Sequence, residues 1–91
     1  MEHRVIVNGK QWIMSFSRDL PEGEDGSCDH PSVKGKKIKV RKSLPQHLEL
    51  EVIIHELLHA ASFEVLAEEF VDETSESIGQ ILWRLGWRKT L

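Results

Sequence analysis

The hydrophobic and polar positions near the N-terminus predict a β-hairpin. Residues 4–7 and 11–16 are rich in β-branched and aromatic side chains, which favour extended strands. Asn8 and Gly9 lie between these segments, and this dipeptide supplies the two positive-φ positions of a type I′ turn. We therefore expect two antiparallel strands joined by a two-residue turn.

The pattern changes after this hairpin. Residues 18–35 contain two prolines and three glycines without a regular period, which predicts a loop. Residues 37–41 (Lys-Ile-Lys-Val-Arg) alternate polar and apolar positions, which predicts a half-buried strand. Outward-facing lysines are typical of an edge strand, where charge discourages pairing with another chain.

Two helices are expected in the C-terminal half. Ser43 is a candidate cap for a helix over about 45–64, with Pro45 in its first turn. A turn at 64–67 leads to a second helix over about 67–85, whose apolar stripe is Val71, Thr74, Ser75, Ile78, Leu82 and Leu85, with Ile81 beside it.

The end of the second helix is marked by Gly86, a suitable C′ residue, with Trp87 placed to pack back on the last turn. The element order is therefore hairpin, loop, strand, helix, helix. We expect an α+β fold of one domain, residues 1–91, in which a small antiparallel sheet (the hairpin plus the edge strand) packs against two helices.

Composition narrows the class of protein. No apolar run is long enough to cross a bilayer, the N-terminus lacks a signal-peptide layout, and the single cysteine, Cys28, fits a reducing compartment. We expect a soluble cytoplasmic protein without membrane contact.

Charged residues are unevenly distributed along the chain. Six of the twelve basic residues lie within 34–42, and nine of the fifteen acidic residues lie within 49–76, where they are available as metal ligands.

The candidate chemistry lies in the segment His55-Glu56-Leu57-Leu58-His59. Histidines four residues apart on a helix share one face and can bind a single ion, here Zn²⁺. Zinc lowers the pKa of a bound water to about 7, and the carboxylate of Glu56 can take the proton as attack begins. The flanking residues are apolar around most of the helix, and burying these three polar groups without partners would cost several kcal/mol.

A catalytic zinc usually has three protein ligands, so one more is needed. The second helix offers five acids: Glu68, Glu69, Asp72, Glu73 and Glu76. At 100° per residue, Glu68 lies at the edge of the apolar stripe, whereas Glu69 and Glu76 point away from it. We expect Glu68 as the third ligand, with Glu73, on the opposite edge, as the second choice.

This pattern resembles the zincin metallopeptidases, particularly the gluzincin-like group, and very small bacterial and phage-encoded proteins of that kind. The resemblance covers roughly residues 26–88 and is carried by Lys37 to Val40, His55 to Ala60, Glu68-Glu69, and Leu85 to Arg88. It implies a zinc-dependent hydrolase of peptides or proteins, with zinc on His55 and His59 and Glu56 as general base. It also implies that the strand 37–41 aligns a peptide substrate by β-augmentation. The spacing of Glu73 from His59 resembles that of other zinc peptidases.

Two features depart from that resemblance. The chain has no tyrosine, so His30, Arg41 or the zinc itself must stabilise the oxyanion. The chain is also far shorter than most peptidases, so a homodimer or a larger assembly is one way to complete a substrate cleft.

Other interpretations stay open. The chain is alternatively a metal-binding regulatory or interaction module that does not cleave peptides. A third hypothesis is nucleic-acid binding through Lys34 to Lys42, which the absence of interleaved aromatic residues disfavours. Cys28 and His30 are expected to belong to an ordinary loop.

Overall fold

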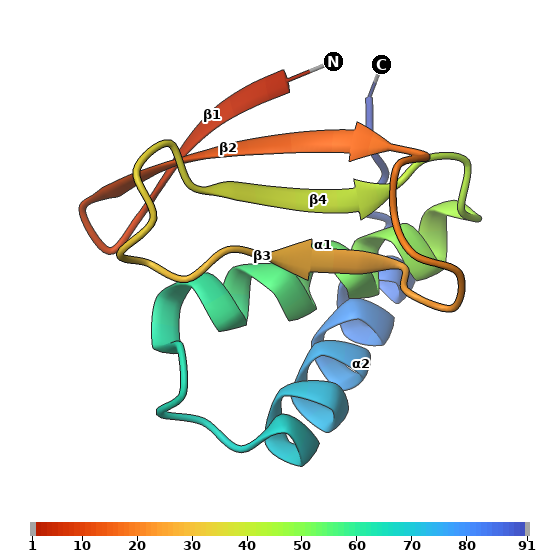
Figure 1. The fold of residues 1–91 in the computed structure, drawn as a ribbon. Helices are drawn as coiled ribbons and strands as arrows, with labels where there is room; N and C mark the ends of the chain where they lie inside the picture. The colour runs from red at the N-terminus through yellow and green to blue at the C-terminus, as the bar shows by residue number, and fades with distance from the viewer. Residues whose placement is uncertain (1, 91) are drawn as a thin grey trace.

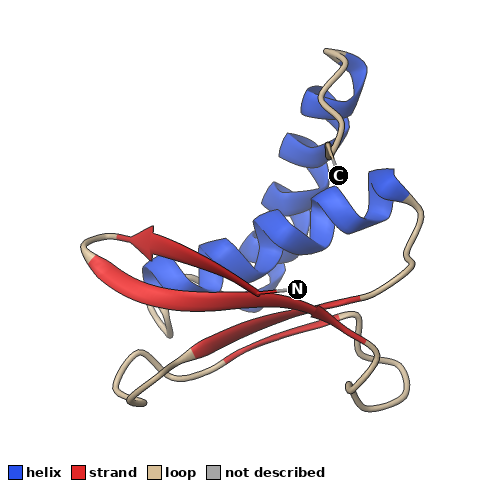
Figure 2. Ribbon diagram, turned by 90° about the horizontal axis from the view of Figure 1, so that it is seen from above, coloured by secondary structure: helices blue, strands red, loops and turns tan. Residues whose placement is uncertain are grey.

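The fold is a four-stranded mixed sheet with two helices on one side of it (Figures 1 and 2). The structure is a computed structural model that describes residues 2–90. Its elements are β1 (Glu2–Val7), β2 (Lys10–Ser17), β3 (Gly26–Cys28), β4 (Lys37–Arg41), α1 (Gln46–Ser62) and α2 (Glu68–Arg84). The expected α+β class is confirmed: α1 packs on the sheet, and α2 packs against α1.

The N-terminal hairpin forms as the sequence predicts. β1 and β2 pair antiparallel, and Val7 lies opposite Lys10 across the turn. Asn8 and Gly9 have φ angles of 49° and 78°, as a type I′ turn requires. The Asn8 side chain also donates a hydrogen bond of 3.1 Å to the carbonyl of Ala61, so the turn is attached to the end of α1.

The expected arrangement of the sheet is wrong in two respects. The strand order is β1-β2-β4-β3, and β2 and β4 run parallel, so the sheet is mixed and not antiparallel. β4 is an inner strand and not an edge strand, because β3, which forms within the predicted loop 18–35, pairs with it. Three residues reading Gly-Ser-Cys carry no β-branched signal, which is why the sequence did not reveal β3.

The alternation along β4 reflects the two faces of the sheet. Ile38 and Val40 are fully buried, and Ile38 joins Trp12, Met14 and Ala60 in the core between the sheet and α1. Lys37 and Lys39 point to the opposite face, which no helix covers (Figure 2). Alternation of this kind identifies a half-buried strand but does not distinguish an inner strand from an edge strand.

The helix ends agree only in part with expectation. The N-cap of α1 is Pro45, without a side-chain capping bond, and Ser43 has a φ of 71° outside the helix, so the predicted Ser43 cap is wrong. At the end of α2, Gly86 has a φ of 96°, and the amides of Gly86 and Trp87 donate to the carbonyls of Trp83 and Leu82. This is the Schellman geometry that Gly86 predicts. Trp87 itself remains 63% exposed.

The buried face of α2 consists mainly of small residues. Val71, Ser75 and Gly79 are buried at successive four-residue steps, whereas Ile78 and Leu85 of the predicted stripe are exposed. A Cβ atom on Gly79 would lie 2.5 Å from Cγ of Glu51 and 3.3 Å from its Cα, so the two helices cross closely there. Within the described residues, neither helix is long and apolar enough to traverse a membrane.

Candidate metal centre

The two histidines of the motif face α2 from adjacent turns of α1. The Nε2 atoms of His55 and His59 lie 3.1 Å apart, and each side chain is about one-fifth exposed. Both ring nitrogens therefore point to the same small volume. This is the arrangement that the four-residue spacing predicts for a pair of metal ligands.

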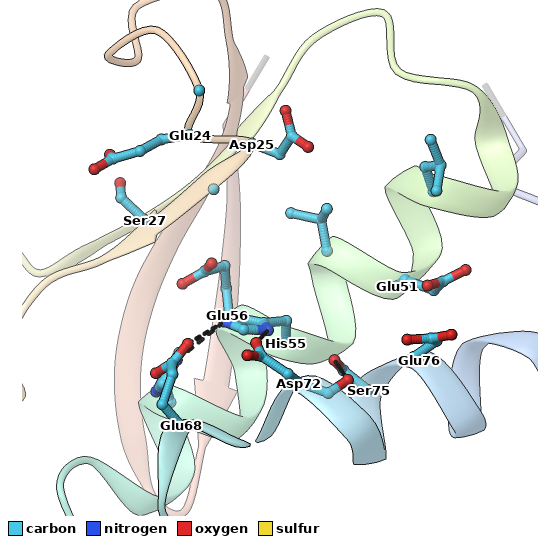
Figure 3. Close-up of a pocket in the computed structure, with 15 residues that line it drawn as sticks. Glu24, Asp25, Ser27, Glu51, His55, Glu56, Glu68, Asp72, Ser75 and Glu76 are labelled. Carbon is cyan, nitrogen blue, oxygen red and sulfur yellow. Dashed lines mark hydrogen bonds and ion pairs between the residues drawn. The ribbon is translucent and has the colours of Figure 1, made fainter. Parts of the chain in front are cut away.

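The third member of the cluster comes from the first residue of α2. Glu68 places Oε1 3.3 Å from Nε2 of His55 and Oε2 3.1 Å from Nε2 of His59 (Figure 3). One ligand atom from each of the three residues lies within 4.8 Å of the others. Glu73, the second choice from the sequence, is exposed on α2 and is not part of this cluster.

The three side chains are placed so that they could hold a metal ion. Ligands around a tetrahedral zinc with bonds of about 2.0–2.1 Å lie roughly 3.3 Å from one another. The two ring nitrogens lie 3.1 Å apart, and each lies 3.1–3.3 Å from a different oxygen of Glu68, which is close to that spacing. Two imidazoles and one carboxylate also form a donor set typical of zinc, and it leaves a fourth position for a water or a substrate. His55, His59 and Glu68 are thus geometrically able to bind a metal ion, whose identity the geometry does not fix.

A fourth residue contacts the cluster from α2. Oδ1 of Asp72 lies 3.3 Å from Nδ1 of His55, on the side of the ring opposite Glu68. A carboxylate in this position fixes the tautomer of a metal-binding histidine and raises its basicity. From the sequence, Asp72 is only one of five candidate acids on the second helix. Its position one turn after Glu68 is the signal that distinguishes it, because residues four apart share a helix face.

Glu56 lies in the same pocket but differs in environment from the other carboxylates. Its side chain is only 6% exposed, and Gly26 of β3 packs against it so closely that a Cβ on Gly26 would lie 2.8 Å from Oε2. Burial, followed by the negative charges of Glu68 and Glu24, raises the pKa of Glu56 to about 7. A carboxyl group with this pKa can accept and release a proton near neutral pH.

The cluster opens into a pocket of about 790 Å³ between the two helices and the loop before β3 (Figure 3). Its walls come from residues 23–27, from α1 and from α2. β3 is the edge strand on this side of the sheet, and Gly26 and Ser27 line the pocket. The expectation that residues 37–41 align a peptide is therefore wrong, since β4 is paired on both sides.

Neither predicted oxyanion donor lines this pocket. The guanidinium of Arg41 donates to the carbonyls of Pro21 and Glu24 and pairs with Asp25, so it holds the loop that forms one wall. His30 packs its ring against Phe63 and contacts Ser32. Ordinary loop roles, and not electrophilic ones, account for both side chains.

Cys28 lines a smaller neighbouring pocket with Glu56, His59 and Phe63. Burial, followed by the charges of Glu56 and Asp29, raises the pKa of the Cys28 thiol to about 12. A thiol that stays protonated is a poor nucleophile and a poor metal ligand. Cys28 is therefore unreactive in character, but it lies in β3 and not in the loop expected for it.

Comparison with known proteins adds nothing to this description, because no protein-family model, no curated protein and no solved structure matches the chain. The resemblance of residues 55–59 to zincins therefore remains a prediction from the sequence.

Proposed function

We propose that this protein is a zinc-dependent metallopeptidase in which His55, His59 and Glu68 hold the metal and Glu56 is the general base. One observation carries the proposal. A buried carboxyl group with a pKa of about 7 lines the same pocket as a cluster of three side chains that could hold a metal ion. A structural role for the two histidines would not require a buried carboxyl group beside them.

Zinc bound at this cluster would supply Lewis acidity, which polarises a carbonyl group and acidifies a water molecule. The residues of the chain would perform the proton transfers. Glu56 would accept a proton from the attacking water as its oxygen bonds to the carbonyl carbon. It would then give that proton to the amine nitrogen as the carbon–nitrogen bond breaks. A pKa of about 7 suits both halves of this cycle at neutral pH.

The substrate in this proposal is an extended peptide. β3 has a free edge beside the pocket, and an added strand could pair with its backbone groups. Only three residues of β3 are available, so pairing would position a short segment. This replaces the alignment along residues 37–41 that the sequence suggested.

The first experiment is elemental analysis of tag-free protein, with His59→Ala as the test variant and His47→Ala as its matched control. His47 is a histidine on the same helix that packs against Trp83, away from the cluster. About one zinc per chain in the wild type and in His47→Ala, and none in His59→Ala, is the expected result. Absence of metal from the wild type after zinc is supplied would refute the proposal.

Proteolysis is tested next with a mixture of unstructured peptides analysed by mass spectrometry. Glu56→Gln should retain zinc and lose cleavage, whereas Glu69→Gln, an exposed acid on α2, should retain both. Cleavage by carefully purified Glu56→Gln at the wild-type rate would exclude Glu56 as the base.

A second function is favoured by one feature of the pocket. Among the described residues that line it there is no lysine, arginine or tyrosine to stabilise an oxyanion. The alternative is a metal-binding regulatory or interaction module without turnover. It predicts bound zinc, no cleavage of any peptide, and a Glu56→Gln variant with full biological activity.

A further inference from the structure

α2 carries exposed apolar side chains on a face that no other described element covers. Among the elements of residues 2–90, α2 packs only against α1, and it lies on the side of α1 away from the sheet (Figures 1 and 2). Phe70, Ile81 and Leu85 are each more than half exposed, and Ile78 is exposed as well. Single apolar residues on a surface are ordinary, whereas apolar residues gathered on one face mark an interaction site.

These side chains lie along one stripe of the helix. At 100° per residue, five positions fall within an arc of about 80° around the helix axis. They form the outer stripe of α2, which consists of Phe70, Thr74, Ile78, Ile81 and Leu85. Leu85 belongs to it because its αR backbone continues the helix beyond Arg84. The stripe extends over the whole length of α2, about 25 Å, which suits packing against another helix.

The outer stripe is separate from the metal cluster. Around the helix axis, Glu68 and Asp72 project roughly 120–160° away from the centre of the stripe. Both side chains face the pocket between the two helices (Figure 3). A partner on the outer stripe would therefore leave the metal cluster and its pocket open.

One edge of the outer stripe carries an acid and a base. Glu73 and Arg84 lie on this same edge, near opposite ends of α2. They are about 16 Å apart along the axis, which is too far for the two to pair within one chain. Neither forms an ion pair with any of residues 2–90. Both charges are therefore free to pair with another molecule.

Two such helices are complementary to each other when they pack antiparallel. A twofold axis near Ile78 brings the same edge of each helix together with its direction reversed. Glu73 of one copy then lies beside Arg84 of the other, and the reciprocal pair forms as well. Phe70 meets Leu85 of the other copy. Parallel packing would instead place Glu73 against Glu73 and Arg84 against Arg84.

We propose that the outer stripe is the interface of a homodimer, in which α2 of one copy packs antiparallel against α2 of a second copy. Charge complementarity favours a second copy over an unrelated protein, because the sequence of α2 supplies both members of each ion pair. The contact is limited to one helix and its ion pairs are exposed, so the dimer is weak and forms at micromolar or higher concentration. Dimerisation does not depend on the metallopeptidase function, since neither Glu73 nor Arg84 belongs to the metal cluster.

Sedimentation equilibrium of the full, tag-free chain measures the oligomeric state. Concentrations from about 5 to 500 µM cover the weak affinities expected of an interface limited to one helix. The average mass should rise with concentration from 10.5 kDa toward twice that value. A mass that stays at 10.5 kDa over the whole range overturns the proposal.

Ile81→Glu tests whether the outer stripe is the contact surface. Ile81 is exposed, so the variant should keep the circular dichroism spectrum of the wild type while the Kd of the dimer rises at least about tenfold. Ile6→Glu is the matched control, because Ile6 is an exposed isoleucine on β1, and it should dimerise like the wild type. Unchanged affinity in Ile81→Glu would place the interface elsewhere and overturn the proposal.

Charge reversal tests the antiparallel pairing. Glu73→Arg and Arg84→Glu should each raise the Kd roughly tenfold, because each places like charges together at two symmetric contacts. The double variant Glu73→Arg/Arg84→Glu should recover the wild-type affinity, although both changes oppose the helix dipole. Added salt should reduce these differences.

Glu22→Arg and Arg4→Glu are the controls for charge reversal. They make the same changes of charge at exposed positions outside α2, and both should keep the wild-type affinity. Recovery in the double variant supports the antiparallel homodimer. Single variants that dimerise like the wild type, or a double variant weaker than both of them, would overturn it.

Discussion

Nδ1 of His55 lies 3.3 Å from Oδ1 of Asp72, while Nε2 of the same ring lies 3.3 Å from Glu68. One imidazole thus lies between two carboxylates that are a single helical turn apart on α2. The first carboxylate is placed to share a metal ion, and the second is placed to orient the ring. The cluster therefore depends on how α2 packs across α1, as well as on the motif in α1.

Replacing Asp72 tests this orientation. Asp72→Ala should keep one zinc per chain but weaken zinc binding about 10–100-fold, because the ring loses its fixed tautomer and basicity. A competition titration with a chromophoric chelator measures the change. Glu73→Ala is the matched control on the same helix, and equal affinities in the two variants would contradict a role for Asp72.

The identity of the third ligand can be tested through stability. Because His55 and Glu68 come from different helices, zinc should stabilise the folded chain by about 2.7 kcal/mol at a hundredfold excess over Kd. Glu68→Gln should lose most of this gain, and Glu73→Gln should retain it. Thermal unfolding with and without EDTA measures both, and an equal zinc-induced shift in the two variants would exclude Glu68.

The features that the sequence predicts correctly are those that depend on residues close together in the chain. Alternation, the Asn8-Gly9 turn and Gly86 located the hairpin and the end of α2, and spacing selected the pair His55 and His59 together with Glu68. It failed where pairing between distant segments decides the result. β3 and the parallel pairing of β2 with β4 depend on long-range contacts that no window of sequence contains.

The buried face of α2 also differs from the face that the sequence predicts. The predicted apolar stripe is based on large apolar residues, and it therefore includes Ile78 and Leu85. Val71 and Ser75 of the predicted stripe are buried, but so is Gly79, which the prediction left out, and the two helices approach closely there because glycine has no side chain. The side chains of Ile78 and Leu85 remain at the surface.

Gly79→Ala tests this close approach. Alanine is ordinarily favoured over glycine inside a helix by about 1 kcal/mol. Here the new Cβ would lie 2.5 Å from Cγ of Glu51 and 3.3 Å from its Cα, so we expect a net destabilisation of about 1–3 kcal/mol. Urea unfolding measures it, with Ser77→Ala at an exposed position of the same helix as the control. A Gly79→Ala protein more stable than the wild type would show that the helices separate at little cost.

Cys28 should be almost unreactive in the folded chain. Burial, and then Glu56, raise the pKa of its thiol from 9.0 to about 12, so the thiolate population at pH 8 falls on the order of a thousandfold. Alkylation by iodoacetamide should be correspondingly slow in buffer and fast in denaturant. Glu56→Gln should accelerate it, because one of the two neighbouring charges is removed. Equal rates for folded and unfolded protein would contradict this environment.

Glu56 should make the metal-free protein less stable as pH rises. Its pKa is about 7 when folded, against an ordinary value of 4.5, so between these values the folded state binds more protons than the unfolded chain. The free energy of unfolding should therefore fall across that interval, by up to about 3 kcal/mol from this group, and level off above it. Glu56→Gln should flatten the profile and be the more stable protein at pH 8. Urea unfolding in EDTA at pH 5 and pH 8 measures the difference, with exposed Glu69→Gln as the control. Profiles of equal slope in Glu56→Gln and the wild type would mean that the buried carboxylate is not the group responsible.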